Sequence, residues 1–319
     1  MNFFKKIKLD YYSKTIPDLF NQKKFSEIKE VFEKIYKLDR RSALLLFRKY
    51  YLDLSHTPKK NFFDNNIVWI NSFLKSDCQI IIDFFDFYFK KTKFQSIGFL
   101  DYSNELLTIN KSLQLNEGNF ENIVNDSYFY QYCIGQNHPL NSINFIKNQI
   151  PFFETSNKKM FSIPNITKCF FYIVRDPIEV LTLLNQNNNQ DNAIMELLNL
   201  DQKPLVLNQE TQFIQIARKD WQTNVNSWTN ENVIESFNGL VLTTSDLQKD
   251  PYTIFAEVIA HLIQAGVDLN LDYNLIQEYI EHKHFKPEPI EKQNLSNHKK
   301  KLLKGIAKTA QDWGYDINL

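Results

Sequence analysis

The chain has 319 residues and a formal net charge of zero, because 37 lysines and arginines balance 37 aspartates and glutamates. A neutral chain sets up no overall field that attracts nucleic acid or an anionic membrane, so neither is expected as a partner. Only 7 residues are glycine, and no G-x-G-x-x-G or G-x-x-x-x-G-K-[ST] motif occurs, which excludes the common glycine-rich nucleotide loops.

The cysteines and histidines are not spaced as in disulfide frameworks or metal sites. Cys78, Cys133 and Cys169 lie far apart, which suits a reducing compartment, so a cytoplasmic location is expected. The histidines form no H-x-x-x-H or H-E-x-x-H pattern, so no metal site is expected. The N-terminal apolar run is too short for a signal peptide, and Asp83 and Asp86 interrupt the longest apolar stretch. No membrane span is therefore predicted.

Residues 1–60 are predicted to form a helical N-terminal extension. Lysines and glutamates lie opposite an apolar face with helical spacing, formed by Phe25, Ile28, Val31, Phe32 and Ile35. Two interpretations stay open: a helical hairpin that packs on the main body, or a helix that docks a protein partner. The stretch 56–66 holds a proline and an Asn/Asp cluster, which is typical of a boundary. Residues 61–319 are expected to form the main domain.

Strands and helices alternate in the first half of the main domain. Residues 67–73 are apolar and β-branched, as in a buried strand, and after a short turn residues 79–90 show a helical pattern. The span 91–150 is expected to consist mainly of helices and loops. A second strand is predicted at 169–174. Helices at 178–185 and 192–200 should follow it, with a polar loop between them.

The same alternation continues toward the C-terminus. Residues 211–237 are predicted to be one amphipathic helix, with Trp221 and Trp228 seven positions apart on one face. A third strand and a turn are expected at 239–247, and a long helix at 251–265. Strands that alternate with helices favour an α/β fold with a parallel sheet.

Four segments, in this order, resemble motifs of the nucleotide-sulfate (PAPS) dependent sulfotransferases, particularly the bacterial single-domain members. IVWINSFLKSDCQI (67–80) resembles the strand and loop W-I-x-S-[YF]-P-K-S-G-x-T-W, and KCFFYIVRDPIEV (168–180) resembles Y-I-V-R-[DN]-P-x-D-V-x-x-S. Residues 185–199 occupy the place of the family's short loop and I-D-x-A-I-x-x-M helix. Residues 219–262 resemble its W-S-x-H-V-x-S-W segment and the Y-E-D-L region that follows. The resemblance implies a three-layer α/β sandwich with a central parallel sheet, of the P-loop or sulfotransferase-like kind.

The resemblance also implies a reaction and a cofactor. Family members transfer a sulfuryl group from 3′-phosphoadenosine 5′-phosphosulfate to a hydroxyl or amine. The donor's 5′-phosphosulfate would lie on the backbone N–H groups of the strand-to-helix loop. An arginine and a serine would hold its 3′-phosphate, and a histidine in a K-T-H segment would act as general base. The acceptor could be a hydroxylated small molecule, a sugar or a peptide.

Several residues of this chain match the implied donor site. Lys75 and Ser76 match the K-S of the loop, and Ser72 matches the serine before it. Arg175 matches the 3′-phosphate arginine, and Lys75 would also be catalytic. Thr182 lies one position before Leu183, which takes the place of the family's serine. The pair Lys304 and Gly305 resembles an R-K-G loop over the 3′-phosphate. The cofactor-binding residues so implied are Ser72, Lys75, Ser76, Arg175, Thr182, Lys304 and Gly305.

Other positions depart from the family pattern. The loop glycine is Asp77, whose charge would repel a phosphosulfate by on the order of 1 kcal/mol even where solvent screens it. The K-T-H segment aligns with residues 154–156, so Ser156 would replace the histidine and Glu154 the lysine. His138 is the only histidine in the span expected to build the acceptor site. It is either a substitute base or an ordinary turn residue.

Three readings of function stay open. In the first, the protein is a pseudo-sulfotransferase that keeps the fold, has a degraded donor site and works through binding. In the second, it is an active but divergent sulfotransferase that uses Lys75, Arg175 and an atypical base such as His138 or Glu154. In the third, it is a binding module for another ligand, and residues 1–60 dock a protein partner.

Overall fold

The computed structural model describes a strand-rich centre and most of the C-terminal half of the chain. The described residues are 3–22, 67–76, 78–94, 96–101, 143–149, 151–152, 167–186, 190–200, 205–206, 215–216, 220–282 and 297–317, together with isolated helical positions between 27 and 42.

A five-stranded sheet with strand order β2-β3-β1-β4-β7 forms the centre of the molecule. Every neighbouring pair in it is parallel, which confirms the predicted α/β fold. The two inner strands β1 and β4 are almost fully buried apolar runs, as expected for strands covered on both faces. The strands are β1 (Ile67–Ser72), β2 (Ser96–Asp101), β3 (Ile143–Asn148), β4 (Thr167–Val174) and β7 (Gly239–Thr243).

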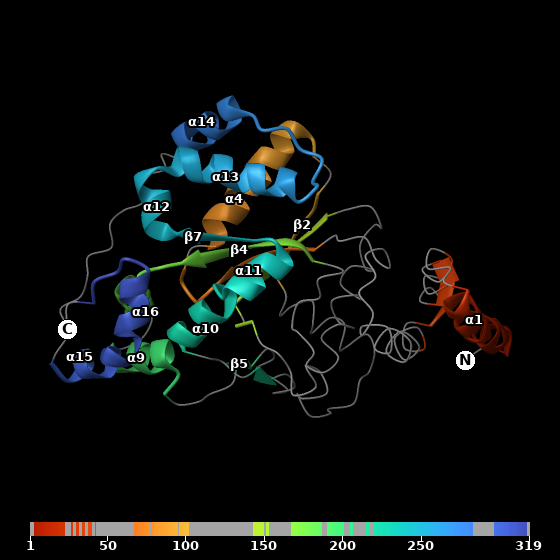
Figure 1. The fold of residues 1–319 in the computed structure, drawn as a ribbon, viewed down its shortest axis with the longest axis horizontal. Helices are drawn as coiled ribbons and strands as arrows, with labels where there is room; N and C mark the ends of the chain where they lie inside the picture. Colours follow the sequence, from red (N-terminus) through yellow and green to blue (C-terminus); the bar gives the residue numbers. More distant parts are fainter. Residues whose placement is uncertain are drawn as a thin grey trace.

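Helices cover both faces of the sheet, so the molecule has the three layers that were predicted (Figure 1). One layer holds α4 (Cys78–Thr92), α13 (Pro251–Gln264) and α14 (Tyr273–His282), with α12 (Thr244–Lys249) at its end. The other layer includes α8 (Pro177–Asn185), α9 (Gln190–Leu198), α10 (Trp221–Trp228), α11 (Glu231–Phe237), α15 (Asn297–Leu303), the 3-10 turn η1 (Lys304–Ile306) and α16 (Ala307–Asp312). A short antiparallel pair, β5 (Leu205–Val206) and β6 (Gln215–Ile216), lies outside the main sheet.

An aromatic core joins α4, α13 and α14 to the first face of the sheet. Phe84 stacks on Phe255 with ring centroids 4.2 Å apart, and Tyr279 meets both rings edge-on. Phe85 packs against Phe171 of β4. Large apolar side chains buried in this way supply most of the free energy that holds such a layer on a sheet.

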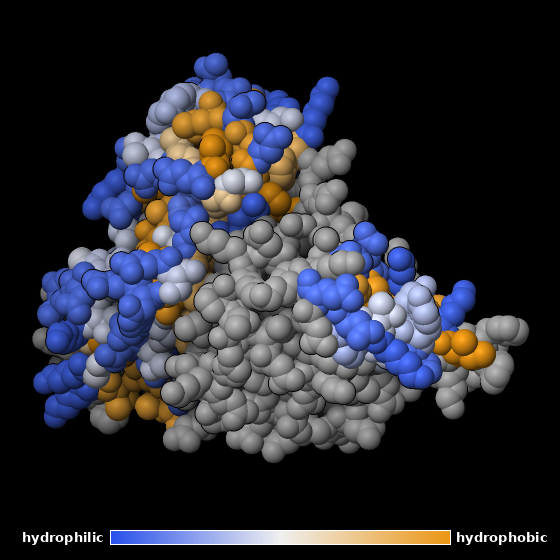
Figure 2. Space-filling model, turned by 45° about the vertical axis from the view of Figure 1, so that its right-hand side comes forward, coloured by the Kyte–Doolittle hydropathy of each residue, from blue (hydrophilic) through white to orange (hydrophobic). Residues whose placement is uncertain are grey.

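The second face packs on α10. Trp228 contacts Phe170 and lies nearly parallel to Tyr172, both of β4. Trp221 and Trp228 are fully buried on one side of α10, as their spacing predicted. Figure 2 shows a mixture of apolar and polar side chains over the outer surface of the helices, with the described helix α1 at one side.

The N-terminal extension contains α1 (Phe3–Asn21). Val31 and Ile35 are buried, as their place on the apolar face predicted, whereas Phe25, Ile28 and Phe32 lie outside the described residues. Figure 1 shows α1 to one side of the sheet. The division at residue 60 stays a prediction.

Two predictions about secondary structure were wrong. The span 91–150 contributes two strands, β2 and β3, that the sequence did not reveal. The single helix expected over 211–237 is instead β6 followed by two helices. The helices separate at Thr229 and Asn230, because the Asn230 side chain accepts a hydrogen bond from the Asn232 N–H and so starts α11.

Candidate functional site

The order of the strands singles out one place at the edge of the sheet. The connection that leaves β1 leads to β2 on one side, and the connection that leaves β4 leads to β7 on the other side. The carboxyl ends of β1 and β4 are therefore the topological switch point, where open α/β sheets bind their ligands. The described residues of the two loops at this switch point are 73–76 and 175–176.

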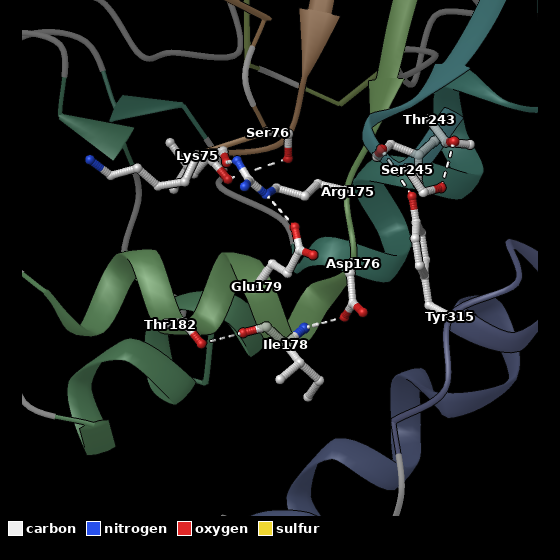
Figure 3. A network of polar contacts seen from close by, with 12 residues as sticks. Lys75, Ser76, Arg175, Asp176, Ile178, Glu179, Thr182, Thr243, Ser245 and Tyr315 are labelled. Atoms are coloured by element: carbon white, nitrogen blue, oxygen red, sulfur yellow. Dashed lines mark hydrogen bonds and ion pairs between the residues drawn. The ribbon is translucent and has the colours of Figure 1, made fainter. Parts of the chain in front are cut away.

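The loop after β1 turns at Lys75. Lys75 has a φ of 58°, in the left-handed region that favours glycine, and the Ser76 N–H donates to the Phe73 carbonyl at 3.2 Å. A non-glycine residue in this conformation costs on the order of 1 kcal/mol. The Lys75 side chain is exposed and extends away from Arg175, while its backbone carbonyl faces the arginine (Figure 3).

Arg175 links the two loops of the switch point. Its side chain is only 4% exposed; its Nε donates to Glu179 Oε2 at 3.0 Å and its Nη1 to the Lys75 carbonyl oxygen at 3.1 Å. Hydrogen bonds from a guanidinium to a carboxylate are among the stronger ones in proteins, and burial reduces their screening by water. The structure therefore brings Lys75 and Arg175 together, but through the lysine's backbone rather than its amino group.

Helix α8 begins immediately after Arg175. Asp176 caps it, because the Asp176 Oδ1 accepts a hydrogen bond from the Ile178 N–H at 2.7 Å, and Pro177 occupies the first turn. Thr182 is buried in this helix and donates its hydroxyl to the Ile178 carbonyl at 2.9 Å. The hydroxyl proton of Thr182 is thus used inside α8.

The two serines of the β1 loop differ in their contacts. Ser76 is buried, and its Oγ lies 3.5 Å from the Leu74 carbonyl, at the limit of a hydrogen bond. Ser72 is 1% exposed, and its hydroxyl oxygen has no hydrogen-bond partner among the described residues. A buried hydroxyl left in this state costs about 1–3 kcal/mol, so Ser72 is the matched residue whose hydroxyl is unused.

A buried group of uncharged polar side chains lies on the α10 face of the sheet, and sequence analysis missed it. The Asn148 amide donates to Asn71 Oδ1 at 3.1 Å, across the register that pairs β3 with β1. The Tyr172 hydroxyl donates to Asn224 Oδ1 at 2.7 Å, and burial raises the pKa of Tyr172 well above its ordinary value. Asn224 donates in turn to the Gln149 carbonyl at 3.1 Å. A run of polar residues at the ends of adjacent strands could have revealed this group, if β3 had been recognised.

Lys304 and Gly305 form the exposed 3-10 turn η1 near the C-terminus. A Cβ built on Gly305 would meet no atom within 4 Å, so packing within the described residues does not require a glycine there.

Several residues of the sequence argument lie outside the described residues, namely Asp77, His138 and the segment 154–156. Asn148 and Gln149, at the end of β3, lie beside the switch point, since Asn148 pairs with Asn71.

No group of three or more histidine, cysteine, aspartate or glutamate side chains that could hold a metal ion occurs within the described ranges. Among the helices that the structure describes, none is long and apolar enough to cross a membrane.

Comparisons with known proteins give a weak likeness only. No family model and no curated protein matches the chain. Similar solved structures include retinol dehydratase in a complex with retinol and PAP, at 13% identity and a TM-score of 0.42; the match covers 82% of this chain and 84% of that chain. Retinol dehydratase in complex with androsterone and inactive cofactor PAP matches at 13% identity and a TM-score of 0.41, over 73% of this chain and 68% of that chain. A likeness of this size assigns neither a family nor an activity to the chain.

Proposed function

We propose that this chain is a pseudo-sulfotransferase, a sulfotransferase-like protein that acts through binding and does not transfer sulfate. The observation that carries the proposal is the contact between the Lys75 carbonyl and Arg175 Nη1 at the switch point. The order of the four motifs supports the sulfotransferase likeness, and this contact supports the loss of the donor site.

A phosphosulfate is held by N–H groups that converge on it, because its oxygens carry negative charge. At the switch point a carbonyl oxygen of the β1 loop faces the buried guanidinium instead, and the Ser76 N–H is used by the Phe73 carbonyl. The Lys75 amino group, which would balance the charge of the leaving phosphate, lies in solvent. These residues do not fit the phosphosulfate as the family motif requires.

The position of the general base supports the same conclusion. The segment that aligns with K-T-H supplies no histidine, since its third residue is Ser156. An amide or a hydroxyl of ordinary pKa cannot take a proton from an acceptor near neutral pH at a useful rate.

The alternative is an active, divergent sulfotransferase, and one observation favours it. The partner of Arg175 is Glu179, and the family pattern R-[DN]-P-x-D also has an acidic residue at that place. The ion pair by itself therefore does not exclude a donor site that uses Ser72, Lys75 and Arg175. His138 or Glu154 would then act as base.

A label-transfer assay separates these two functions. The purified full chain is incubated with donor labelled in its sulfuryl group and with panels of sugars, hydroxylated lipids and peptides. We expect no transfer above the protein-free rate. Transfer that disappears in both Lys75→Ala and Arg175→Ala would establish the active enzyme. Lys93→Ala is the matched control, because Lys93 is also an exposed lysine with positive φ, at 56°.

Binding to a protein partner through residues 1–60 remains a third proposal. The exposed side of α1 carries Ile7 and Tyr11, which are 50% and 66% exposed and lie one helical turn apart. If this side docks a partner, the double change Ile7→Ser and Tyr11→Ser should abolish capture of that partner without lowering the melting temperature. Unchanged capture would remove residues 1–60 from the proposal. A cytoplasmic location is part of the same proposal.

A further inference from the structure

The last residues of the chain return to the switch point. Helix α16 ends in a Schellman turn, in which the Tyr315 N–H donates to the Ala310 carbonyl and the Gly314 N–H to the Gln311 carbonyl, both at 2.9 Å. Gly314 has a φ of 75°, which only glycine adopts readily. This turn sends the chain away from the axis of α16, so that Tyr315 and Ile317 become buried.

Tyr315 reaches the carboxyl ends of β4 and β7. Its ring is 7% exposed, and its hydroxyl donates to the Val174 carbonyl, the last of β4, at 3.2 Å. Figure 3 shows the ring rising from the C-terminal segment toward Ser245 and Thr243. Burial raises the pKa of Tyr315 to about 12, although hydrogen bonds with the hydroxyls of Ser245, Thr244 and Thr243 lower it.

Tyr315 thereby lies next to the residues that flank Arg175 in the chain. The Tyr315 hydroxyl is bonded to the carbonyl of Val174, the residue before Arg175. The carboxylate of Asp176, the residue after Arg175, is near enough to raise the pKa of Tyr315. The Arg175 carbonyl is held separately, because it accepts a hydrogen bond from Trp221 Nε1 at 3.2 Å. Two aromatic donors from distant parts of the sequence thus bind the two successive peptide groups on either side of the Arg175 Cα.

We propose that Tyr315 is a positioning residue for Arg175, so that the C-terminal segment 314–317 is part of the switch-point site. This inference rests on the proposed function, because it takes the switch point to be the binding site. It adds that the guanidinium keeps its place between Lys75 and Glu179 only while the Tyr315 hydroxyl holds the end of β4.

The test follows the Arg175 Nε–H in a ¹H–¹⁵N spectrum of the ligand-free full chain. The sequence holds few arginines, and Arg175→Lys identifies the signal by removing it. In Tyr315→Phe we expect this proton to exchange with water about fivefold faster, the factor that matches loss of one hydrogen bond of ordinary strength. A purely structural role would lower the melting temperature and leave this exchange rate unchanged.

Tyr279→Phe is the matched control. Tyr279 is also a buried tyrosine, with its hydroxyl 3.5 Å from the Ile80 carbonyl, but it lies on the opposite face of the sheet. It should leave the Arg175 signal as in the unaltered chain. Equal exchange rates in Tyr315→Phe and the unaltered chain would overturn the proposal.

If Tyr315→Phe fails to fold, Gly314→Ala replaces it, because a φ of 75° at this position strains any residue but glycine and so displaces the segment that carries Tyr315. Faster exchange at Arg175 would then support the proposal, and an unchanged rate would overturn it. Since no donor is added, the outcome does not depend on whether the chain binds a nucleotide sulfate.

Discussion

At the scale of single residues, Gly239 lies where the sheet leaves no room for a side chain. A Cβ built there would collide with the ring of Phe170, its cross-strand neighbour on β4. We expect Gly239→Ala to destabilise the fold by about 1–3 kcal/mol, because the buried ring must leave its place under Trp228. Denaturant unfolding measures the loss. Gly305→Ala is the control and should be neutral or slightly stabilising, since open space surrounds that glycine.

For a change at Ser72 we predict a gain of stability instead of a loss. Its buried hydroxyl has no hydrogen-bond partner within the ranges that the structure describes, so Ser72→Ala should stabilise the chain by about 1 kcal/mol by removing an unsatisfied polar group. Thr182→Val should destabilise it by about 1 kcal/mol, because the Thr182 hydroxyl is bonded to the Ile178 carbonyl. Melting curves of both variants test the difference. A loss of stability in Ser72→Ala would mean that the hydroxyl is bonded in solution.

At the scale of elements, α13 shows how a local signal sets a helix. Asp250 accepts hydrogen bonds from the Thr253 N–H at 3.1 Å and the Thr253 hydroxyl at 2.6 Å, and Pro251 occupies the first turn. Asp250→Ala should lower the free energy of unfolding, whereas Asp250→Asn keeps an acceptor and should lower it less. Urea unfolding distinguishes the two variants. Equal stability of Asp250→Ala and the unaltered chain would contradict this role of the cap.

Helix α13 also shows which elements of the fold could be predicted from the sequence alone. Helix α13 and strand β4 could be predicted because their signals are local, namely a capped start and an unbroken apolar run. Strands β2 and β3 could not, because SIGFLD and INFIKN mix polar and apolar residues. Their strand form depends on pairing with β1 and with each other. The break between α10 and α11 was local, since Asn230 is a helix cap, and it could have been recognised.

The candidate site, like the fold, could be predicted from the sequence only in part. The motifs placed Lys75 and Arg175 at the ends of two strands, and the structure brings those ends together. The sequence could not show that the lysine's carbonyl, rather than its amino group, would face the guanidinium, because this depends on one left-handed peptide unit. Nor could it place Asn71 beside Asn148, 77 positions away, before β3 was known.

At the scale of the whole molecule, buried tyrosines make the free energy of unfolding fall as the pH rises in the alkaline range. Burial raises the pKa values of Tyr88, Tyr172, Tyr279 and Tyr315, and that of Tyr315 to about 12. The folded chain therefore holds these protons more tightly than the unfolded chain. This part of the stability is fully present below about pH 10, the unfolded value, and is lost as pH rises through the folded pKa values.

Denaturant unfolding at a series of pH values tests this prediction. The free energy of unfolding should fall steadily above about pH 10. The fall should be smaller in Tyr279→Phe, because that variant has lost one buried phenol. Stability that stays constant up to about pH 12 would contradict the burial of these tyrosines as ionisable groups.

The central proposal is that the switch point of this chain does not bind the sulfate donor that sulfotransferases use. Calorimetric titration of the full chain with 3′-phosphoadenosine 5′-phosphate, the product that keeps both phosphates of the donor, tests it most directly. We predict no binding with a Kd of about 1 μM or tighter, because the Lys75 carbonyl already contacts Arg175 and the Ser76 N–H is bonded to the Phe73 carbonyl. Binding at about 1 μM or tighter that Arg175→Ala abolishes would contradict the claim.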